Sequence, residues 1–189
     1  RPQLGYNAIV VSLDFGGFDT KEDINEIKQL TVSAGFNVSE LVTSKRSNPH
    51  TKYFIGSGKM EEIVLMKETL KANTLIFNHE LTPSQERNIE KITEMRVYDR
   101  TALILYIFSL RAKTYEGKLQ VDLAHLTHLS TRLVKGWSHL ERQKGGIGVR
   151  GGPGEKQIEL DKRMLGLRIK QLKEKLRKLS QQRGMQRRA

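Results

Sequence analysis

The 189-residue sequence contains no cysteine, only four prolines and a single tryptophan. Without cysteine it has neither disulfides nor thiolate metal sites, which is typical of proteins in a reducing compartment. Its longest apolar run, near residues 102–108, falls far short of the roughly 18 residues needed to cross a bilayer. The N-terminus lacks both an initiator Met and an apolar signal segment. We therefore expect a trimmed, cytoplasmic chain without a membrane span.

Acidic residues are scarce in the last part of the chain. Residues 120–189 contain 17 Lys and Arg against 6 Asp and Glu, whereas residues 1–119 contain 16 and 15. Nearly all of the net charge of +12 therefore belongs to the last 70 residues. A basic excess confined to one region indicates a polyanionic partner, most often nucleic acid. A solvated basic face with no specific partner is the alternative.

The first part of the chain alternates short apolar runs with helical patterns. Thr82, Pro83 and Gln85 form a helix start, with Thr as the N-cap, Pro at the first position and Gln three residues after the cap. Asp99 or Thr101 starts a further helix, predicted to run to about Glu116. Strands are predicted at residues 7–13, 36–42, 74–77 and 96–98. The order βαβαβαβα predicts an α/β domain over residues 1–117, a small parallel sheet flanked by helices.

From residue 119 the apolar positions follow a heptad rhythm in two segments. The two stripes are Leu119, Leu123, Leu126, Ser130, Leu133, Trp137, Leu140 and Ile158, Lys162, Leu165, Ile169, Leu172, Leu176, Leu179. They predict a long antiparallel α-helical hairpin over residues 118–189, in which each stripe buries the other. Arms of about 22 residues would be roughly 33 Å long. Gly136 and Gly166 are expected to weaken these arms by about 1 kcal/mol each.

Glycine makes up six of the twelve residues in 145–156. We place the tip of the hairpin at residues 145–154, where free backbone N–H groups and nearby cations favour phosphate contacts. A flexible loop that only closes the hairpin is the alternative. A nucleotide phosphate loop is rejected, because its spacing, its preceding strand and the hydroxyl after its lysine are all missing. The candidate RNA-binding residues are Arg142, Lys144, Gly145, Gly146, Arg150, Gly151, Gly152 and Lys156.

A second glycine motif precedes a predicted helix at residues 56–59. Gly56, Ser57, Gly58 and Lys59 are candidate nucleotide-binding residues, because a helix N-terminus attracts anions. The alternative is a plain turn in which Ser57 caps the helix.

The remaining polar patterns do not support catalysis or metal binding. Residues 14–17 match D-x-x-G loosely and are read as a strand-to-helix turn. His125 and His128 are three residues apart, but a zinc site needs further ligands that the neighbouring sequence lacks. No Ser/His/Asp arrangement is evident. We predict no catalytic residue and no metal site.

Several segments together resemble one protein family. Residues 96–112 (R-V-Y-D-R-T-A-L-I-L-Y-I-F-S-L-R-A), 116–124 (E-G-K-L-Q-V-D-L-A) and 145–163 (G-G-I-G-V-R-G-G-P-G-E-K-Q-I-E-L-D-K-R) resemble the N-terminal region of HflX-type ribosome-associated GTPases. Residues 55–63 and 81–90 resemble the same family. The combined order of these motifs is highly specific, whereas residues 1–54 resemble the family only in pattern.

The resemblance implies an α/β domain, then a helical hairpin, then a GTPase domain that binds GTP and Mg²⁺. Because no phosphate loop occurs before Ala189, we expect this chain to lack the GTPase domain, to be no enzyme and to need no cofactor. Its implied partners are its own GTPase domain and the large ribosomal subunit. The family separates stalled or stress-arrested ribosomes into subunits.

The resemblance also implies a role for the hairpin tip. The tip would reach toward the peptidyl-transferase region, with Lys144 and Arg150 contacting rRNA. It departs from the family pattern by one extra glycine in residues 151–154. The alternative function is an adenine-nucleotide-binding or autoinhibitory regulatory domain that uses the loop Gly56–Lys59.

Overall fold

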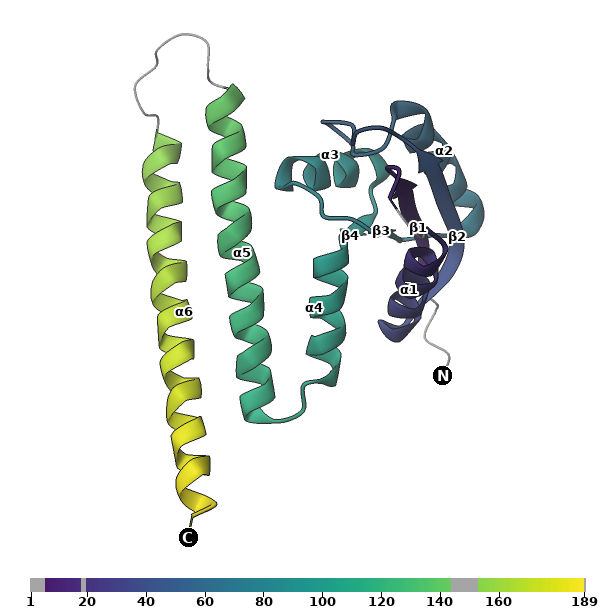
Figure 1. The fold of residues 1–189 in the computed structure, drawn as a ribbon. Helices are drawn as coiled ribbons and strands as arrows, with labels where there is room; N and C mark the ends of the chain where they lie inside the picture. Colours follow the sequence, from purple (N-terminus) through teal and green to yellow (C-terminus); the bar gives the residue numbers. More distant parts are fainter. Residues whose placement is uncertain (1–5, 18–19, 144–152, 189) are drawn as a thin grey trace. The chain divides into compact units, whose positions relative to one another are not determined.

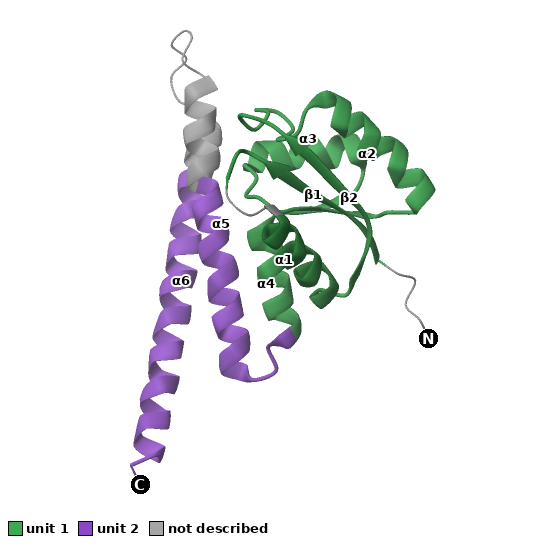
Figure 2. Cartoon of the chain, turned by 45° about the vertical axis from the view of Figure 1, so that its right-hand side comes forward, with its two compact units in different colours: residues 1–110 green, residues 111–189 purple. Residues whose placement is uncertain are grey.

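The structure, a computed structural model, describes residues 6–17, 20–143 and 153–188, without the side chains of residues 20, 134–143 and 153–158. The chain divides into two compact units, residues 1–110 and 111–189 (Figure 2). Figure 1 labels the helices and strands of both units.

Unit 1 is built on a four-stranded parallel sheet. Its strands are β1 (Tyr6–Asp14), β2 (Phe36–Lys45), β3 (Thr74–Phe77) and β4 (Arg96–Tyr98), in the order β2-β1-β3-β4. The predicted bounds of β3 and β4 are confirmed. β2 runs three residues further than predicted, because its parallel pairing with β1 continues to the pair of Asp14 and Lys45.

Helices cover both faces of this sheet (Figure 1). They are α1 (Thr20–Ser33), α2 (Ser57–Leu70), α3 (Pro83–Thr93) and α4 (Arg100–Arg111). One buried cluster joins α2 and α3 to one set of strand side chains, and a second joins α1 and α4 to the alternate set. Neighbouring residues of β1 show the alternation, since Ile9 belongs to the first cluster and Val10 to the second. The predicted α/β architecture is confirmed.

Side-chain caps fix where the helices of unit 1 begin. Thr82 and Gln85 form the predicted reciprocal capping box, in which Oγ1 of Thr82 accepts from the Gln85 N–H at 3.1 Å and Oε1 of Gln85 accepts from the Thr82 N–H at 3.0 Å. The buried Asp99 starts α4, its Oδ1 accepting from the Ala102 N–H at 2.8 Å.

The helix predicted to run from Asp99 to about Glu116 is instead two helices. α4 ends at Arg111, and α5 starts at Tyr115. The hydroxyl of Thr114 accepts a hydrogen bond from the Gly117 N–H at 3.0 Å. Thr114 is therefore an N-cap, which favours a fresh helix start over continuation.

Unit 2 contains two long helices, α5 (Tyr115–Gln143) and α6 (Pro153–Gln186). They run side by side in opposite directions (Figure 1), and Oε2 of Glu116 near the start of α5 lies 2.6 Å from Nη1 of Arg183 near the end of α6. Among the described side chains of this pair, Leu119 and Leu172 are buried. The other described stripe positions are at least partly buried, as the heptad pattern predicts. With 29 and 34 residues, the helices are about 43 and 51 Å long, which exceeds the predicted 22-residue arms.

Candidate nucleic-acid interface

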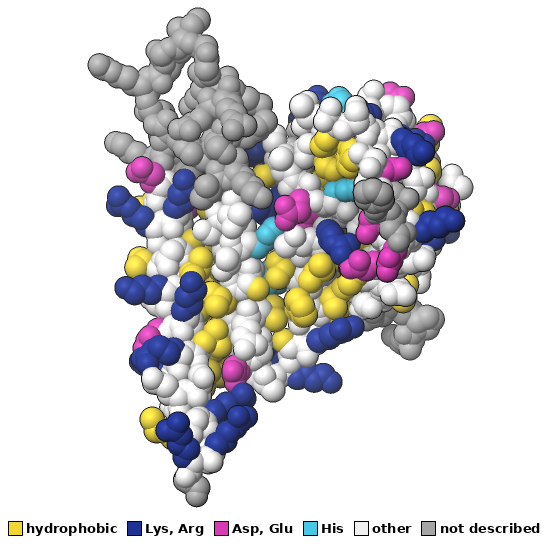
Figure 3. Space-filling view, in the orientation of Figure 1, with side chains coloured by type: hydrophobic (Ala, Val, Ile, Leu, Met, Phe, Trp, Pro, Cys, Tyr) yellow, Lys and Arg dark blue, Asp and Glu magenta, His cyan; other side chains and the backbone are white. Residues whose placement is uncertain are grey.

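Positive charge in the chain is concentrated in unit 2. Residues 111–189 contain 20 Lys and Arg against 7 Asp and Glu, whereas residues 1–110 contain 13 and 14. Within α6 and the two residues after it the excess is stronger, because residues 162–188 contain 11 Lys and Arg and a single acid, Glu174. Figure 3 shows these cations as dark blue side chains along α6.

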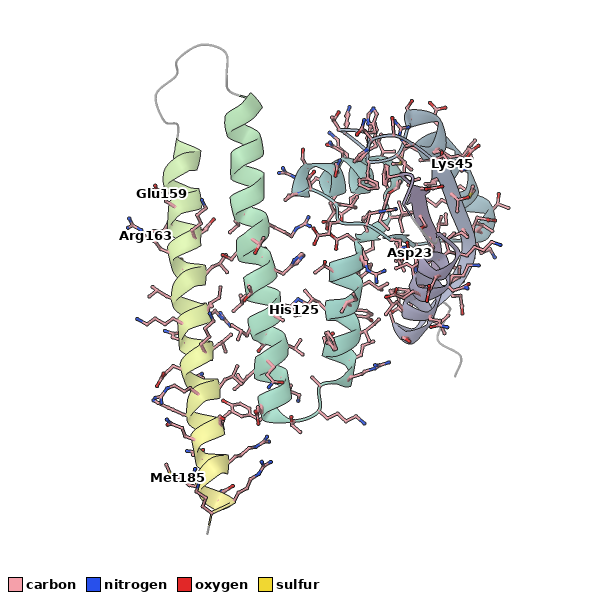
Figure 4. All side chains as sticks on the ribbon, in the orientation of Figure 1. Asp23, Lys45, His125, Glu159, Arg163 and Met185 are labelled. Carbon is pink, nitrogen blue, oxygen red and sulfur yellow. The ribbon has the colours of Figure 1, made fainter. Side chains whose placement is uncertain are left out.

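Most of these cations are exposed and have no ionic partner within the described part of the chain. The apolar stripe explains their placement, because it occupies the side of α6 that packs on α5 and leaves the remaining positions for charge. In Figure 4, Arg163 points away from α5. The exposed cations without a described ion pair are Arg163, Arg168, Lys170, Lys173, Lys175, Arg187 and Arg188.

The spacing of these cations gives the interface its geometry. Arg163, Lys170 and Arg177 follow one another at intervals of seven residues, which corresponds to about 10.5 Å along the helix axis. Because seven residues are close to two turns, the three lie on one side of α6. Such a row offers successive charges to an extended polyanion.

Glu174 engages two neighbouring cations. Its Oε1 lies 2.7 Å from Nη2 of Arg177, its Oε2 lies 2.9 Å from Nε of the same guanidinium, and Nζ of Lys178 is 4.0 Å from Oε1. The hydrogen bonds from Arg177 lower the pKa of Glu174, and the same bonds raise the pKa of Arg177. Glu174 thus holds Arg177, one cation of the row, in a bidentate pair.

The predicted tip lies mostly outside the described residues. Six of the candidate residues belong to the segment 144–152: Lys144, Gly145, Gly146, Arg150, Gly151 and Gly152. Arg142 lies in α5 and Lys156 in α6, and the side chains of both are outside the description. Their role in binding stays a prediction. The exposed cations of α6 were not among the predicted site residues, although the charge run of residues 162–178 is visible in the sequence.

The loop Gly56–Lys59 lies at the N-terminus of α2. Gly56 is the N-cap and no side chain caps the helix, so the alternative in which Ser57 acts as the cap is wrong. A Cβ on Gly56 would lie 2.6 Å from Nη1 of Arg46, so the guanidinium lies directly beside Gly56 and would have to move if a side chain were added there. Nζ of Lys59 pairs with Oε2 of Glu62 at 3.1 Å. The arrangement places Arg46 near free helical N–H groups, and nucleotide binding there stays a prediction.

At the carboxyl edge of the sheet, His79 makes internal contacts. His79 accepts a hydrogen bond at Nε2 from the Leu13 N–H at 2.8 Å, and its ring contacts Phe15 and Phe54. Burial lowers the pKa of His79 to about 4, which outweighs the opposite effect of Asp23. The imidazole is therefore neutral near pH 7 and serves packing. Residues 14–17 form the predicted turn, with the Gly16 N–H donating to Oδ1 of Asp14 at 2.8 Å.

Among the residues that the structure describes, no group of three or more His, Cys, Asp or Glu side chains is placed to hold a metal ion. In the same part of the chain, no helix combines the length and the apolar character that crossing a membrane requires.

Two family models together match most of the chain. The model described as "GTP-binding GTPase N-terminal" matches residues 21–109, and "GTP-binding GTPase Middle Region" matches residues 111–189. The division between them coincides with the division between the two compact units. The boundary is therefore marked both by packing and by sequence.

Curated relatives share the name GTPase HflX. The chain is 50% identical to the protein of Escherichia coli K12 over 183 residues, which cover 97% of this chain and 43% of that protein. It is 47% identical to the Flavobacterium psychrophilum protein over 167 residues, covering 88% and 40%. The chain thus spans about two fifths of the length of these relatives.

Solved structures share the fold. A GTP-binding protein from the archaeon Sulfolobus solfataricus, crystallised with GDP, has a TM-score of 0.63 at 22% identity over 92% of this chain and 46% of that one. The crystal structure of the SsGBP and GDP complex has a TM-score of 0.67 at 21% identity, over 95% of this chain and 46% of that one. At these identities the likeness concerns the fold alone.

Proposed function

Because the chain belongs to the HflX family of GTPases and carries its N-terminal and middle regions, we propose that it binds the large ribosomal subunit through rRNA. The observation that supports this proposal is the set of exposed α6 cations, among them Arg163, Lys170 and Lys173, that have no ion pair with any residue the structure describes. Ribosomal RNA is the polyanion that matches the family's association with ribosomes.

The α6 cations supply affinity by neutralising phosphates. Each Lys or Arg that contacts a phosphate releases condensed counterions, so affinity falls steeply as salt rises. The antiparallel pairing with α5 keeps α6 helical and fixes the spacing of its charges. The residues between the two helices, with Lys144 and Arg150, are proposed to reach toward the peptidyl-transferase region.

GTP hydrolysis is expected in a different domain of the full-length protein. These 189 residues contain no phosphate loop, so GTP and Mg²⁺ are expected at a GTPase domain of the full-length protein, which would also be a partner of this region. Splitting of stalled ribosomes in the cytoplasm during stress is the proposed role of that whole protein. This region contributes the binding energy.

Co-sedimentation with large ribosomal subunits across a salt series tests the proposal. Lys170, Lys173 and Lys175, all changed to Gln, should weaken binding at least tenfold and flatten the salt dependence. The matched control changes three exposed cations of unit 1, Lys21, Arg87 and Lys91, to Gln and should bind normally. Equal binding by both triple variants, or an affinity independent of salt, would refute the proposal.

The tip is tested separately. Lys144→Ala combined with Arg150→Ala should weaken ribosome binding while the thermal unfolding midpoint stays unchanged. A lower unfolding midpoint with unchanged ribosome binding would instead show that these residues stabilise the fold and do not contact the ribosome.

A regulatory adenine-nucleotide site is the second candidate function. The position of Arg46 beside Gly56 at the start of α2 favours it, because a guanidinium and free N–H groups can share a phosphate. Calorimetry with ATP would show binding that Lys59→Ala or Arg46→Ala weakens. An absence of binding heat at millimolar ATP would reject this candidate.

A further inference from the structure

A hollow of about 400 Å³ opens at the amino edge of the sheet in unit 1. The starts of all four strands meet there, since Tyr6 pairs with Phe36 and Thr74 pairs with Arg96. This edge is opposite the carboxyl edge, where β2 leads into the segment before Gly56–Lys59. The residues that line the hollow are Tyr6, Phe36, Asn73, Thr74, Arg96, Tyr98 and Tyr106.

Aromatic rings form one wall of the hollow. Phe36 is nearly buried and lies at the centre, with ring centroids 5.9 Å from Tyr6, 5.8 Å from Tyr98 and 6.0 Å from Tyr106. Tyr98 and Tyr106 are 5.7 Å apart. Tyr6 is 50% exposed, so part of its ring surface is open to an incoming planar group. Such surfaces stack on nucleobases, whatever the base.

Polar groups of the hollow have unused hydrogen-bonding capacity. Arg96 is exposed and has no ion pair with any other described residue. The side chain of Asn73 accepts at Oδ1 from the hydroxyl of Thr74 at 2.9 Å, which leaves its amide N–H groups to donate. Within the same described part of the chain, the hydroxyls of Tyr98 and Tyr106 have no hydrogen-bond partner.

Together, the aromatic rings, the Arg96 guanidinium and the Asn73 amide indicate which class of ligand the hollow can bind. The unpaired guanidinium disfavours a cation and favours phosphate, which it can bind in a bidentate manner. The rings favour a flat heterocycle, and the amide favours a ligand with hydrogen-bonding edges. A purely structural aromatic cluster explains the buried Phe36, but it gives no role to the exposed ring of Tyr6 or to Arg96.

We propose that this hollow binds a nucleobase that carries a phosphate, with the base on the tyrosine rings and the phosphate on Arg96. The nucleotide is either free or an unpaired residue of an RNA strand. The site is independent of the α6 cations and stands if the proposed ribosome binding fails.

The test uses calorimetry with the whole 189-residue chain and two kinds of probe. AMP and UMP represent free nucleotides, and single-stranded rA and rU octamers represent RNA. Binding of the mononucleotides assigns the site to free nucleotides. Saturable binding of the octamers alone assigns it to unpaired RNA.

Variants locate the binding at the hollow. Tyr6→Ala should weaken binding about 5- to 150-fold, as expected for one lost base–aromatic stack. Arg96→Gln should remove the preference for AMP over adenosine. The control Arg87→Gln removes an exposed cation of α3 outside the hollow and should bind normally.

Two results would overturn the proposal. One is the absence of saturable binding of either probe at millimolar concentration. The other is octamer binding that Tyr6→Ala and Arg96→Gln leave unchanged but that Lys170, Lys173 and Lys175→Gln abolish, because the RNA would then be held by α6. Circular dichroism melting of each variant shows whether a loss of binding reflects unfolding.

Discussion

Removal of one acid from α6 should strengthen RNA binding. Glu174 is the single acid among residues 162–188, and it holds Arg177 in a bidentate pair while also attracting Lys178. Glu174→Gln keeps the size of the side chain and removes its charge. The guanidinium is then released for a phosphate, and the repulsion between Glu174 and the RNA disappears.

The size of the effect follows from counterion release. One additional phosphate contact makes the slope of log K against log salt steeper by about 0.7 to 0.9. If such a contact contributes nothing near about 1 M salt, it tightens binding about 4- to 6-fold at about 0.15 M. Glu174 is exposed, so the substitution should leave folding nearly unchanged.

The assay is a filter-binding or sedimentation titration with large ribosomal subunits at four salt concentrations. Glu61→Gln is the matched control, because it makes the same charge change at an exposed position of α2 in unit 1. The reasoning is refuted if Glu174→Gln binds with equal or lower affinity while its circular dichroism spectrum matches the parent. It is also refuted if Glu61→Gln gains as much affinity, since net charge alone would then decide binding.

Three stability predictions follow from local contacts. Thr114→Ala removes the cap on Gly117 and should destabilise α5 by about 1 kcal/mol in chemical denaturation, whereas Thr114→Ser should be nearly neutral. Gly166→Ala should stabilise α6 by about 1 kcal/mol, because no atom lies within 4 Å of the added Cβ; a lower unfolding midpoint would contradict this. The pKa of His79 is lowered from 6.5 to about 4. The contribution of the neutral imidazole to the free energy of unfolding should therefore be fully present above pH 6.5. It should fall by about 1–2 kcal/mol toward pH 4, after allowance for partial exposure. His79→Gln should flatten that pH profile, and an NMR titration midpoint near 6.5 would disprove the shift.

Local signals in the sequence predicted much of the fold. The capping box of Thr82 and Gln85 requires residues only three apart, and the structure forms it as expected. Strand β3 is a short, fully buried run with polar neighbours, and β4 is a three-residue strand directly before the cap Asp99, which leaves little freedom in their ends. The two heptad stripes predicted the packing side of α5 and α6, because a period of 3.5 residues defines one face regardless of distant contacts.

Features that depend on contacts between distant segments were missed. The length of β2 depends on its pairing with β1, which the sequence of β2 alone does not show. The break at residues 112–114 was missed for a different reason, because its cap is a local contact from Thr114 to Gly117 that lies within an otherwise helical pattern. The hollow at the amino edge forms where the starts of the four strands and α4 come together. No short sequence motif therefore predicts it. The charge excess of α6 was predictable, but the sequence does not show which of its cations are left without an ion pair in the described part of the chain, as Lys170 and Lys173 are.

Charge along a helix provides affinity but little discrimination between RNAs, because phosphate contacts carry no sequence information. Lys170, Lys173 and Lys175→Gln should therefore weaken binding to large ribosomal subunits and to an unrelated duplex RNA by the same factor. Recognition of one place on the ribosome must come from groups that fit a particular shape, and the glycine-rich segment with Lys144 and Arg150 is the candidate in unit 2. Lys144 and Arg150→Ala should lower affinity for the large subunit more than affinity for the duplex, which competition titrations at one salt concentration would measure. Equal losses on both RNAs would mean that the tip contributes charge only and that specificity resides in another part of the full-length protein.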